Sequence, residues 1–285
     1  MAQAVFDTHV HIFAPSRYPF AAGQTGPAVP YGDAEHLIAL MDAAGVAAAL
    51  LVQTPWLGLD NRYLVESMQR YPGRFAALGY FDHPAAPAAP AELERQYHED
   101  RFRGLRLHLA NSSRGFVDDE RVIGELLSGA VDPLFQQARR LGVPVQFLNR
   151  VSNSHVIVTI ADRYPDLTVV VDHLGHPLVA EAPAFPSSAP LFSLAERPNV
   201  FVKVSNHVLS SRQPYPWADL HGYQRRLLDA FGPRRLMWGS NWPMDTPQLG
   251  YAERLAAVRD ELTFLEGEEK EWLLGRTAYS LWQPV

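Results

Sequence analysis

The chain has 285 residues, of which 47% are hydrophobic and 20% are charged, values that are ordinary for globular proteins. The net charge of -6 comes without a basic stripe, which argues against a nucleic-acid partner. The absence of cysteine excludes disulfides, thiolate metal sites and a cysteine nucleophile. Neither a signal-peptide pattern nor an apolar run long enough for a membrane span occurs, so we expect a cytoplasmic protein without a membrane partner.

Short runs of apolar, β-branched and aromatic residues recur along the chain and predict eight strands. These strands cover residues 4–10, 48–53, 75–81, 104–109, 143–147, 167–172, 200–204 and 236–238. Segments with apolar residues at helical spacing separate the strands. The predicted helices cover residues 33–44, 61–71, 132–141, 154–164, 220–231 and 251–262, with an additional C-terminal helix at 268–281. Strands that alternate with helices indicate parallel βαβ units, and eight of them predict a (β/α)8 TIM barrel as one domain over residues 1–285.

An open, doubly wound sheet is the alternative architecture. Such a sheet usually carries a glycine-rich phosphate loop after its first strand, whereas this chain has Thr8, His9, Val10 and His11 there. The proline-rich segment 84–90 predicts a loop with polyproline character. Two further segments rich in glycine or proline, 24–30 and 183–190, predict loops that line or cover the site.

Two histidines at the end of the first predicted strand carry the strongest functional signal. His9 and His11 are two residues apart, so on a strand their imidazoles point to the same side. In barrels of this kind the carboxyl ends of the strands build the active site, and His173 follows the sixth predicted strand. Further polar residues end other predicted strands: Gln53, Thr54, Arg106, His108, Gln146, Lys203, Ser205 and Asn241. Several polar groups that converge in this way predict a binding pocket.

Each of these residues also has a purely structural interpretation. The two strand-1 histidines could be ordinary side chains, one hydrogen-bonded and one exposed. His173 could be satisfied by a backbone carbonyl, and Arg106 could pair with an acid on a neighbouring strand. Trp242 fits a packing role at least as well as a place in the pocket wall.

Four sequence motifs together resemble the amidohydrolase superfamily. They are FDTHVHIF at residues 6–13, RYPF at 17–20, VDHLGHP at 171–177 and RLMWGSNWP at 235–243. Within the superfamily they are most similar to the branch of 2-pyrone-4,6-dicarboxylate lactonase, sulfomuconolactonase and L-fuconolactonase. The resemblance covers nearly the whole chain in order, and it implies a (β/α)8 barrel that hydrolyses a lactone or a related ester-like bond. It also implies that His9, His11 and His173 are the family's histidines of strands 1 and 6, and that Arg106 is its arginine of strand 4.

The chain departs from this family pattern at three positions. The family's strand-8 aspartate falls on Asn241. The fifth strand offers Gln146 in place of a histidine or a carboxylated lysine, which argues against a binuclear metal centre. His176 stands where the dicarboxylate lactonase has an arginine, and this weakens the case for a dicarboxylate substrate because arginine is the usual carboxylate clamp.

The amide of Asn241 cannot act as a titrating base, so three explanations stay open. The enzyme could use another base, with Asp245 and Asp7 nearest in the sequence. The protein could be a relative that binds or isomerises its ligand without hydrolysing it. The amide could also be an Asp→Asn change that inactivates the enzyme and traps its substrate.

The leading hypothesis is a hydrolase that opens a sugar-acid or ring-cleavage lactone at the barrel mouth. His9, His11 and His173 would polarise the carbonyl, directly or through one divalent ion such as Zn²⁺ or Mn²⁺, and metal-free action stays open. The predicted catalytic set is His9, His11, His173, Asn241 and Asp245. The predicted substrate contacts are Arg106, Gln53, Thr54, Gln146, Lys203, His176, Tyr18 and Trp242.

Two other classes of function remain as alternatives. One is a metal-dependent, non-oxidative decarboxylase of an aromatic acid, which shares the barrel and the histidines. The other is a barrel that only binds its ligand, either natural or inactivated at Asn241. In every case the expected partner is a small molecule, and the chain is compatible with a homo-oligomer.

Overall fold

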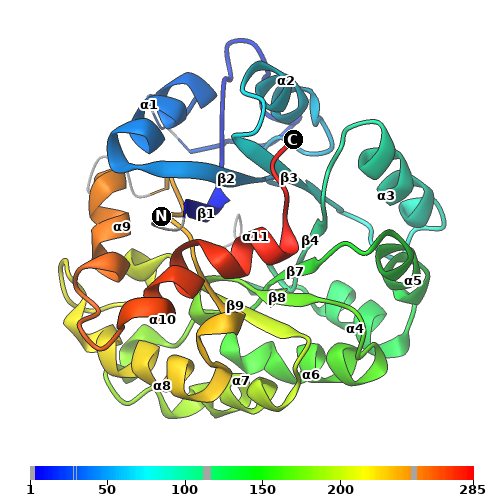
Figure 1. The fold of residues 1–285 in the computed structure, drawn as a ribbon. Helices are drawn as coiled ribbons and strands as arrows, with labels where there is room; N and C mark the ends of the chain where they lie inside the picture. The colour runs from blue at the N-terminus through cyan, green and yellow to red at the C-terminus, as the bar shows by residue number, and fades with distance from the viewer. Residues whose placement is uncertain (1–3, 28, 30, 112–116, 245–248) are drawn as a thin grey trace.

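The computed structural model describes residues 4–27, 29, 31–111, 117–244 and 249–285. Eight parallel strands form one sheet in the order β1-β2-β3-β4-β7-β8-β9-β10, which curls into a nearly closed barrel (Figure 1). The strands are β1 (Val5–Val10), β2 (Val46–Val52), β3 (Phe75–Tyr80), β4 (Leu105–His108), β7 (Val145–Leu148), β8 (Val169–Val171), β9 (Val200–Val204) and β10 (Leu236–Trp238). The predicted TIM barrel is confirmed, and each predicted strand is present with small differences at its ends.

Helices surround the barrel and cover the outer face of its strands (Figure 1). They are α1 (Ala34–Ala44), α2 (Arg62–Arg70), α3 (Ala89–His98), α4 (Glu120–Ser128), α5 (Asp132–Leu141), α6 (Ser154–Arg163), α7 (Ala189–Ser193), α8 (His221–Phe231), α9 (Tyr251–Arg259), α10 (Gly267–Glu271) and α11 (Thr277–Leu281). A short antiparallel pair, β5 (Ala110–Asn111) and β6 (Val117–Asp118), lies between β4 and α4. Within the described ranges, none of these helices has the length and apolar character to cross a membrane.

Three of the described helices, α3, α4 and α7, were missing from the sequence prediction, and α7 begins at Ala189 inside the predicted loop 183–190. The proline-rich segment does not remain a loop to its end, because Pro90 lies in the first turn of α3. Proline fits that position since its missing N–H would have no helical partner there. Helix α4 begins after Asp119, whose carboxylate caps the helix by accepting a hydrogen bond from the N–H of Val122. The predicted C-terminal helix is also divided, because a π-helical stretch separates α10 from α11.

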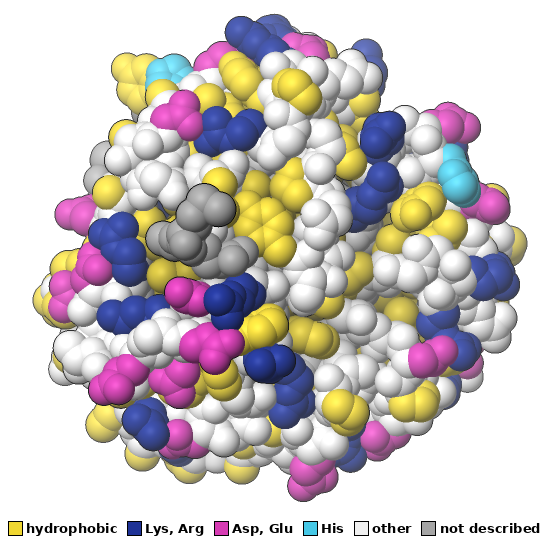
Figure 2. Space-filling view, viewed as in Figure 1, with side chains coloured by type: hydrophobic (Ala, Val, Ile, Leu, Met, Phe, Trp, Pro, Cys, Tyr) yellow, Lys and Arg dark blue, Asp and Glu magenta, His cyan; other side chains and the backbone are white. Residues whose placement is uncertain are grey.

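The C-terminal helix closes the amino-terminal end of the barrel. Helix α11 crosses this end in Figure 1, and the ring of Tyr279 packs edge-on against Phe6 with centroids 5.0 Å apart. Trp282 is almost fully buried in the same apolar cluster, which also includes Leu50 and Met237 from the barrel strands. Around α10, Figure 2 shows acidic and basic side chains side by side, where Arg276 pairs with Glu268 and Glu271.

A buried carboxylate joins the first and last strands. Asp7 accepts hydrogen bonds from the N–H of His9 (3.1 Å), the N–H of Ser240 (2.8 Å) and the hydroxyl of Tyr251 (3.0 Å). The segment after β10 approaches β1 closely at Gly239, where an added Cβ would lie 2.9 Å from the Cβ of His9. This junction fixes the backbone that carries His9, so Asp7 has a structural role here, and burial raises its pKa.

Candidate active site

A cavity of about 200 Å³ opens at the carboxyl ends of the strands. This catalytic cavity is lined by His11, Thr54, Pro55, Trp56, Arg106, His108, Leu148, His173, Asn206, Leu209, Asn241 and Met244. The lining includes the apolar side chains of Trp56, Leu209 and Met244. Its imidazoles and its guanidinium lie in β4 or directly after β1 and β8. A few polar groups in an otherwise apolar pocket are typical of small-molecule sites.

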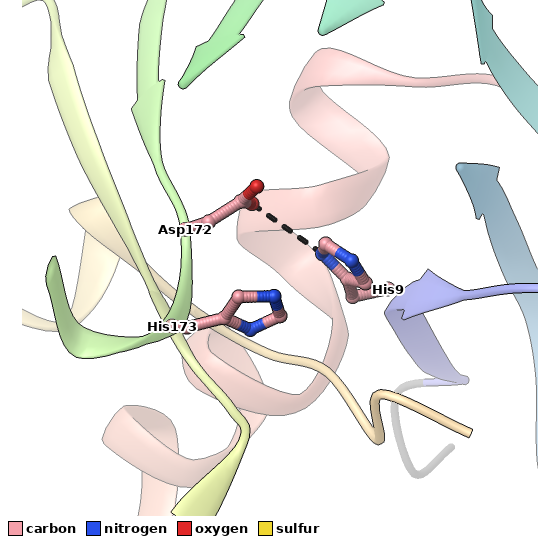
Figure 3. A group of neighbouring side chains, drawn as sticks. All are labelled: His9, Asp172 and His173. Carbon is pink, nitrogen blue, oxygen red and sulfur yellow. Dashed lines mark ion pairs between the residues drawn. The ribbon is translucent and has the colours of Figure 1, made fainter. Parts of the chain in front are cut away.

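Three buried side chains meet where β1 and β8 end. His9 comes from β1, and Asp172 and His173 follow β8, so the side chains converge from opposite sides of the barrel (Figure 3). His9 Nδ1 lies 3.4 Å from Asp172 Oδ1, and the rings of His9 and His173 have centroids 4.3 Å apart. His11 lies beside them, with its ring centroid 4.9 Å from that of His9. The predicted convergence of the three histidines is therefore what the structure shows.

Asp172 is the centre of a buried charge network that the sequence analysis did not assign. Arg106 Nε and Nη2 each lie 2.8 Å from Asp172 Oδ2, which also accepts a hydrogen bond from Gln146 Nε2 at 3.1 Å. Lys203 Nζ is 3.7 Å from Asp172 Oδ1. Burial alone would raise the pKa of Asp172, but Arg106, His9 and Lys203 outweigh it and hold that pKa well below its usual value. Arg106 thus has the carboxylate partner that its structural interpretation required.

Hydrogen bonds at Nδ1 orient the rings of His11 and His173. His11 Nδ1 donates to the carbonyl oxygen of Val52 at 2.8 Å, so in the neutral ring Nε2 carries the lone pair. His173 Nδ1 lies 2.8 Å from the hydroxyl of Ser205, and His9 Nε2 is buried without a hydrogen-bond partner. Burial lowers the pKa of His9 and His173 well below the usual value, and burial together with the charge of Arg106 lowers that of His11 to about 3. All three imidazoles are therefore neutral at physiological pH.

The donor set fits one divalent metal ion. Ligand atoms of His9, Asp172 and His173 lie within 4.8 Å of one another, and imidazole and carboxylate groups suit Zn²⁺ and Mn²⁺. Two of the atoms, His9 Nε2 and Asp172 Oδ1, have no hydrogen-bond partner although they are buried. The charges of Arg106 and Lys203 beside Asp172 oppose a cation and offset part of this attraction. His11 lies outside this group of three, so its place among the ligands stays a prediction.

Two of the predicted substrate contacts lie beneath the cavity. Lys203 is fully buried, and its Nζ donates to the carbonyl oxygen of Thr8 at 2.6 Å and to the side-chain oxygen of Gln146. Its Nζ also lies 3.4 Å from His9 Nδ1, and burial lowers the pKa of Lys203 to about 7. Neither Lys203 nor Gln146 lines the cavity. Lys203 contacts His9 and Asp172, and Gln146 contacts Asp172.

Other predicted contacts are divided between the cavity and its surroundings. Thr54 lines the cavity, and its Oγ1 is buried without a hydrogen-bond partner. The remaining predicted contacts, which are absent from the lining, are Gln53, Tyr18, His176 and Trp242. The side chains of the first three have partners elsewhere: the Gln53 amide donates to Asp60 and Asn61, Tyr18 donates to Glu66, and His176 donates to the carbonyl oxygen of Asn149. Trp242 is buried. Asp245 lies outside the described residues. Their roles toward a substrate stay predictions.

Asn241 forms a pair with a second asparagine that sequence reasoning missed. Its Nδ2 donates to Asn206 Oδ1 at 3.2 Å, and both residues are buried and line the cavity. Both also have left-handed backbones, with φ of 58° for Asn241 and 57° for Asn206. Asparagine adopts this region more readily than most residues. The position of Asn206 two residues after the last β9 residue is the signal that would have placed it at the site.

Comparisons with known proteins place this geometry in a family. Residues 6–283 match the model of a family described as Amidohydrolase. An L-fucono-1,5-lactonase of Burkholderia ambifaria is 30% identical over 244 residues, which cover 84% of this chain and 80% of that protein. A 4-sulfomuconolactone hydrolase of Hydrogenophaga intermedia is 28% identical over 248 residues, 85% of this chain and 76% of that protein. A crystal structure of an amidohydrolase from Burkholderia multivorans with bound zinc superposes with a TM-score of 0.78 at 26% identity and covers 98% of each chain. This chain belongs to the amidohydrolase family.

Proposed function

We propose that the protein, as one domain over residues 1–285, is a hydrolase that opens a small lactone in the catalytic cavity. The observation that carries the proposal is the cluster of three neutral imidazoles, in which His11 and His173 line the catalytic cavity and buried His9 contacts both rings, beside a buried Arg106–Asp172 pair. Relatives that hydrolyse lactones by name, at 28–30% identity over more than four fifths of this chain, support the same reaction.

Ring opening needs an oriented water and a stabilised oxyanion. The lone pair on His11 Nε2 can accept a hydrogen bond from water, because Nδ1 of this ring is held by Val52. The side-chain oxygen of Asn241 can accept a second one, since its Nδ2 is engaged with Asn206. Arg106 lines the cavity and can donate an N–H to the developing oxyanion while Asp172 holds the guanidinium in place. A divalent ion held by His9, His173 and Asp172 would supply Lewis-acid polarisation of the carbonyl when bound.

A panel of lactones tests this proposal. Ring opening releases a proton that a pH indicator follows, and we expect turnover of at least one lactone that is lost in His173→Asn. Release of CO2 from an aromatic acid without turnover of any lactone would establish the decarboxylase instead. Lactones that are not consumed and raise Tm by an amount that grows with their concentration would establish the ligand-binding alternative.

The remaining expectations about this chain stay predictions. They are a cytoplasmic location, a homo-oligomeric state and the absence of nucleic-acid and membrane partners. Metal content after purification, measured by plasma emission, decides between action with about one ion per chain and metal-free action.

A further inference from the structure

A second cavity of about 220 Å³ adjoins the catalytic cavity. The two share Pro55 and His108 in their walls. The second cavity, which we call the side cavity, lies between the ends of β3 and β4 and the start of α4, where Tyr80, Asp82 and Arg121 line it. The side cavity is therefore the neighbouring volume for a substituent of a substrate held in the catalytic cavity.

The cation of the side cavity is already engaged. Arg121 Nη1 lies 2.9 Å and 3.1 Å from the two carboxylate oxygens of Glu125, and its Nη2 donates to the backbone carbonyl oxygen of Asp82 at 3.1 Å. Two carboxylates remain in the lining, those of Asp82 and Asp119. The balance of charge in the described part of this cavity is therefore negative.

These carboxylates are hydrogen-bond acceptors with capacity to spare. Asp82 Oδ1 accepts from the Tyr80 hydroxyl at 3.0 Å, and Asp82 Oδ2 lies 3.4 Å from His83 Nε2. Asp119 Oδ1 accepts from the backbone N–H of Val122 at 3.1 Å. An ionised carboxylate has about four acceptor positions over its two oxygens. At the boundary between the cavities, His108 Nε2 is buried without a hydrogen-bond partner, and the His108 ring lies 5.3 Å from that of Tyr80. The lining thus offers acceptors and neutral polar groups.

Apart from Arg106, which we assign to the reacting oxyanion, the described lining of the catalytic cavity offers no cation for an acidic arm. Arg106 is the charged residue among its described lining, and Asp172 pairs with it in a buried site. A substrate carboxylate or sulfonate would have to compete with Asp172 for the guanidinium while other carboxylates lie in the adjoining side cavity. The half-buried carboxylate of Asp119 repels an anion more strongly than it would in water, and the exposed carboxylate of Asp82 adds a weaker repulsion.

We propose that the side cavity binds an uncharged, hydroxyl-bearing arm of the lactone and discriminates against an acidic arm. This inference rests on the proposed lactone hydrolysis. Hydroxyl groups would donate to Asp82 and Asp119, and the Tyr80 hydroxyl and His108 would complete the contacts. The substrate class is therefore a polyhydroxylated lactone rather than a dicarboxylate or a sulfonate.

Three lactones that share the same reacting ring ester test the inference. They are δ-valerolactone, which has no arm, a neutral polyhydroxylated 1,5-glyconolactone, and the same glyconolactone with a carboxylate in place of its terminal hydroxymethyl group. We expect the wild-type kcat/KM to be highest for the neutral polyhydroxylated lactone, with the acidic one at least about 10-fold lower, which corresponds to about 1.4 kcal/mol. Equal or greater kcat/KM for the acidic lactone would overturn the proposal.

Two variants locate this selectivity in the side cavity. Asp82 is exposed, and reversing its charge in Asp82→Arg should lower the neutral-to-acidic ratio of kcat/KM by about 10-fold. Tyr80→Phe removes one hydroxyl and should lower the ratio of polyhydroxylated lactone to δ-valerolactone by about 3- to 10-fold. Glu94→Arg is the matched control, because Glu94 is exposed on α3 and lines neither cavity, and it should leave both ratios unchanged. Ratios that do not respond to Asp82→Arg, or that respond equally to Glu94→Arg, would also overturn the proposal.

A binding measurement separates this inference from the proposed function. If no lactone is turned over, lactone hydrolysis is wrong, and the lactams that correspond to the first two lactones can be titrated by calorimetry. Tighter binding of the polyhydroxylated lactam than of δ-valerolactam, reduced in Asp82→Arg, would support the side cavity as a binding site without hydrolysis. Equal affinities of the two lactams would refute it.

Discussion

The two ends of the barrel interior are built from the same sheet, but one end is apolar and the other is lined by polar and charged side chains. At the amino-terminal end, Phe6, Met237 and Trp282 form an apolar cluster closed by α11. At the carboxyl end, the same strands carry His9, Arg106 and other polar groups, several of which lack hydrogen-bond partners. Buried polar atoms without hydrogen-bond partners are costly, and at the carboxyl end His9 Nε2, His108 Nε2 and Asp172 Oδ1 are such atoms at or beside the cavity where a ligand is expected.

Lys203 stands between these two regions. Its Nζ contacts the catalytic layer through Gln146 and Asp172, and it also lies 5.5 Å from the centre of the Trp282 ring. The comparison teaches that one end of the interior supplies stability and the other supplies chemistry, with a buried ammonium at the boundary. Substitutions at the two ends should therefore affect different measurements.

The largest expected effect is on activity, at the carboxyl end. His173→Asn should lower kcat/KM by about 10²- to 10⁴-fold, because the reacting carbonyl loses a polarising group. Tm should change little, since asparagine can keep a polar contact with Ser205. His155→Asn, at an exposed position of α6, is the control. A loss within about twofold of wild type would refute the site assignment.

The opposite pattern is expected at the amino-terminal end. Trp282→Ala removes an almost fully buried indole and should lower the free energy of unfolding by about 3–5 kcal/mol. Denaturant titration measures this loss, and kcat/KM per folded molecule should stay within about threefold of wild type. Trp272→Ala, which truncates a half-buried indole on the outer surface of the same segment, should cost clearly less stability. A Trp282→Ala protein that is stable but inactive would show that the two ends are not separable.

A third prediction concerns pH and the buried imidazoles. Burial lowers the pKa of His207 to about 3, whereas a histidine in the unfolded chain has a pKa near 6.5. Below pH 6.5 the unfolded chain therefore binds a proton that the folded chain does not, and stability falls as pH decreases. Each such group contributes a slope of up to about 1.4 kcal/mol per pH unit between the two pKa values.

His207 can be tested apart from the catalytic histidines. It stacks on Trp217 at 5.1 Å and lies 2.7 Å from the Gln224 amide. In His207→Asn the slope of the free energy of unfolding between pH 5 and 6.5 should decrease by about 1 kcal/mol per pH unit. His98→Asn, at an exposed position of α3, is the control. An unchanged slope in His207→Asn would show that this histidine is protonated in the folded state.

The sequence predicted elements whose signals are local. Helix α5 has the predicted bounds, because Gly142 adopts a left-handed backbone immediately after it and ends it. Helix α3 was missed because its buried face includes Gln96, so its apolar periodicity is weak. At the site, the histidines were found from their positions at strand ends. Asp172 was not assigned, because its partner Arg106 is 66 residues away and only the closed barrel brings them together.

The smallest expected effect is at Asn241, where the sequence analysis predicts a departure from the family pattern. In Asn241→Asp the left-handed backbone is retained, because aspartate tolerates it as asparagine does. The carboxylate cannot donate to Asn206, whose amide must turn to present its own N–H, so we expect a cost of about 1 kcal/mol and a kcat/KM lowered about threefold. Asn206→Asp breaks the same amide pair from the other side and should give a similar result. A gain of 10²- to 10⁴-fold in Asn241→Asp alone would instead show that the amide stands in the place of a general base. The wild-type chain would then be an inactivated hydrolase, and its imidazoles would bind the lactone without opening it.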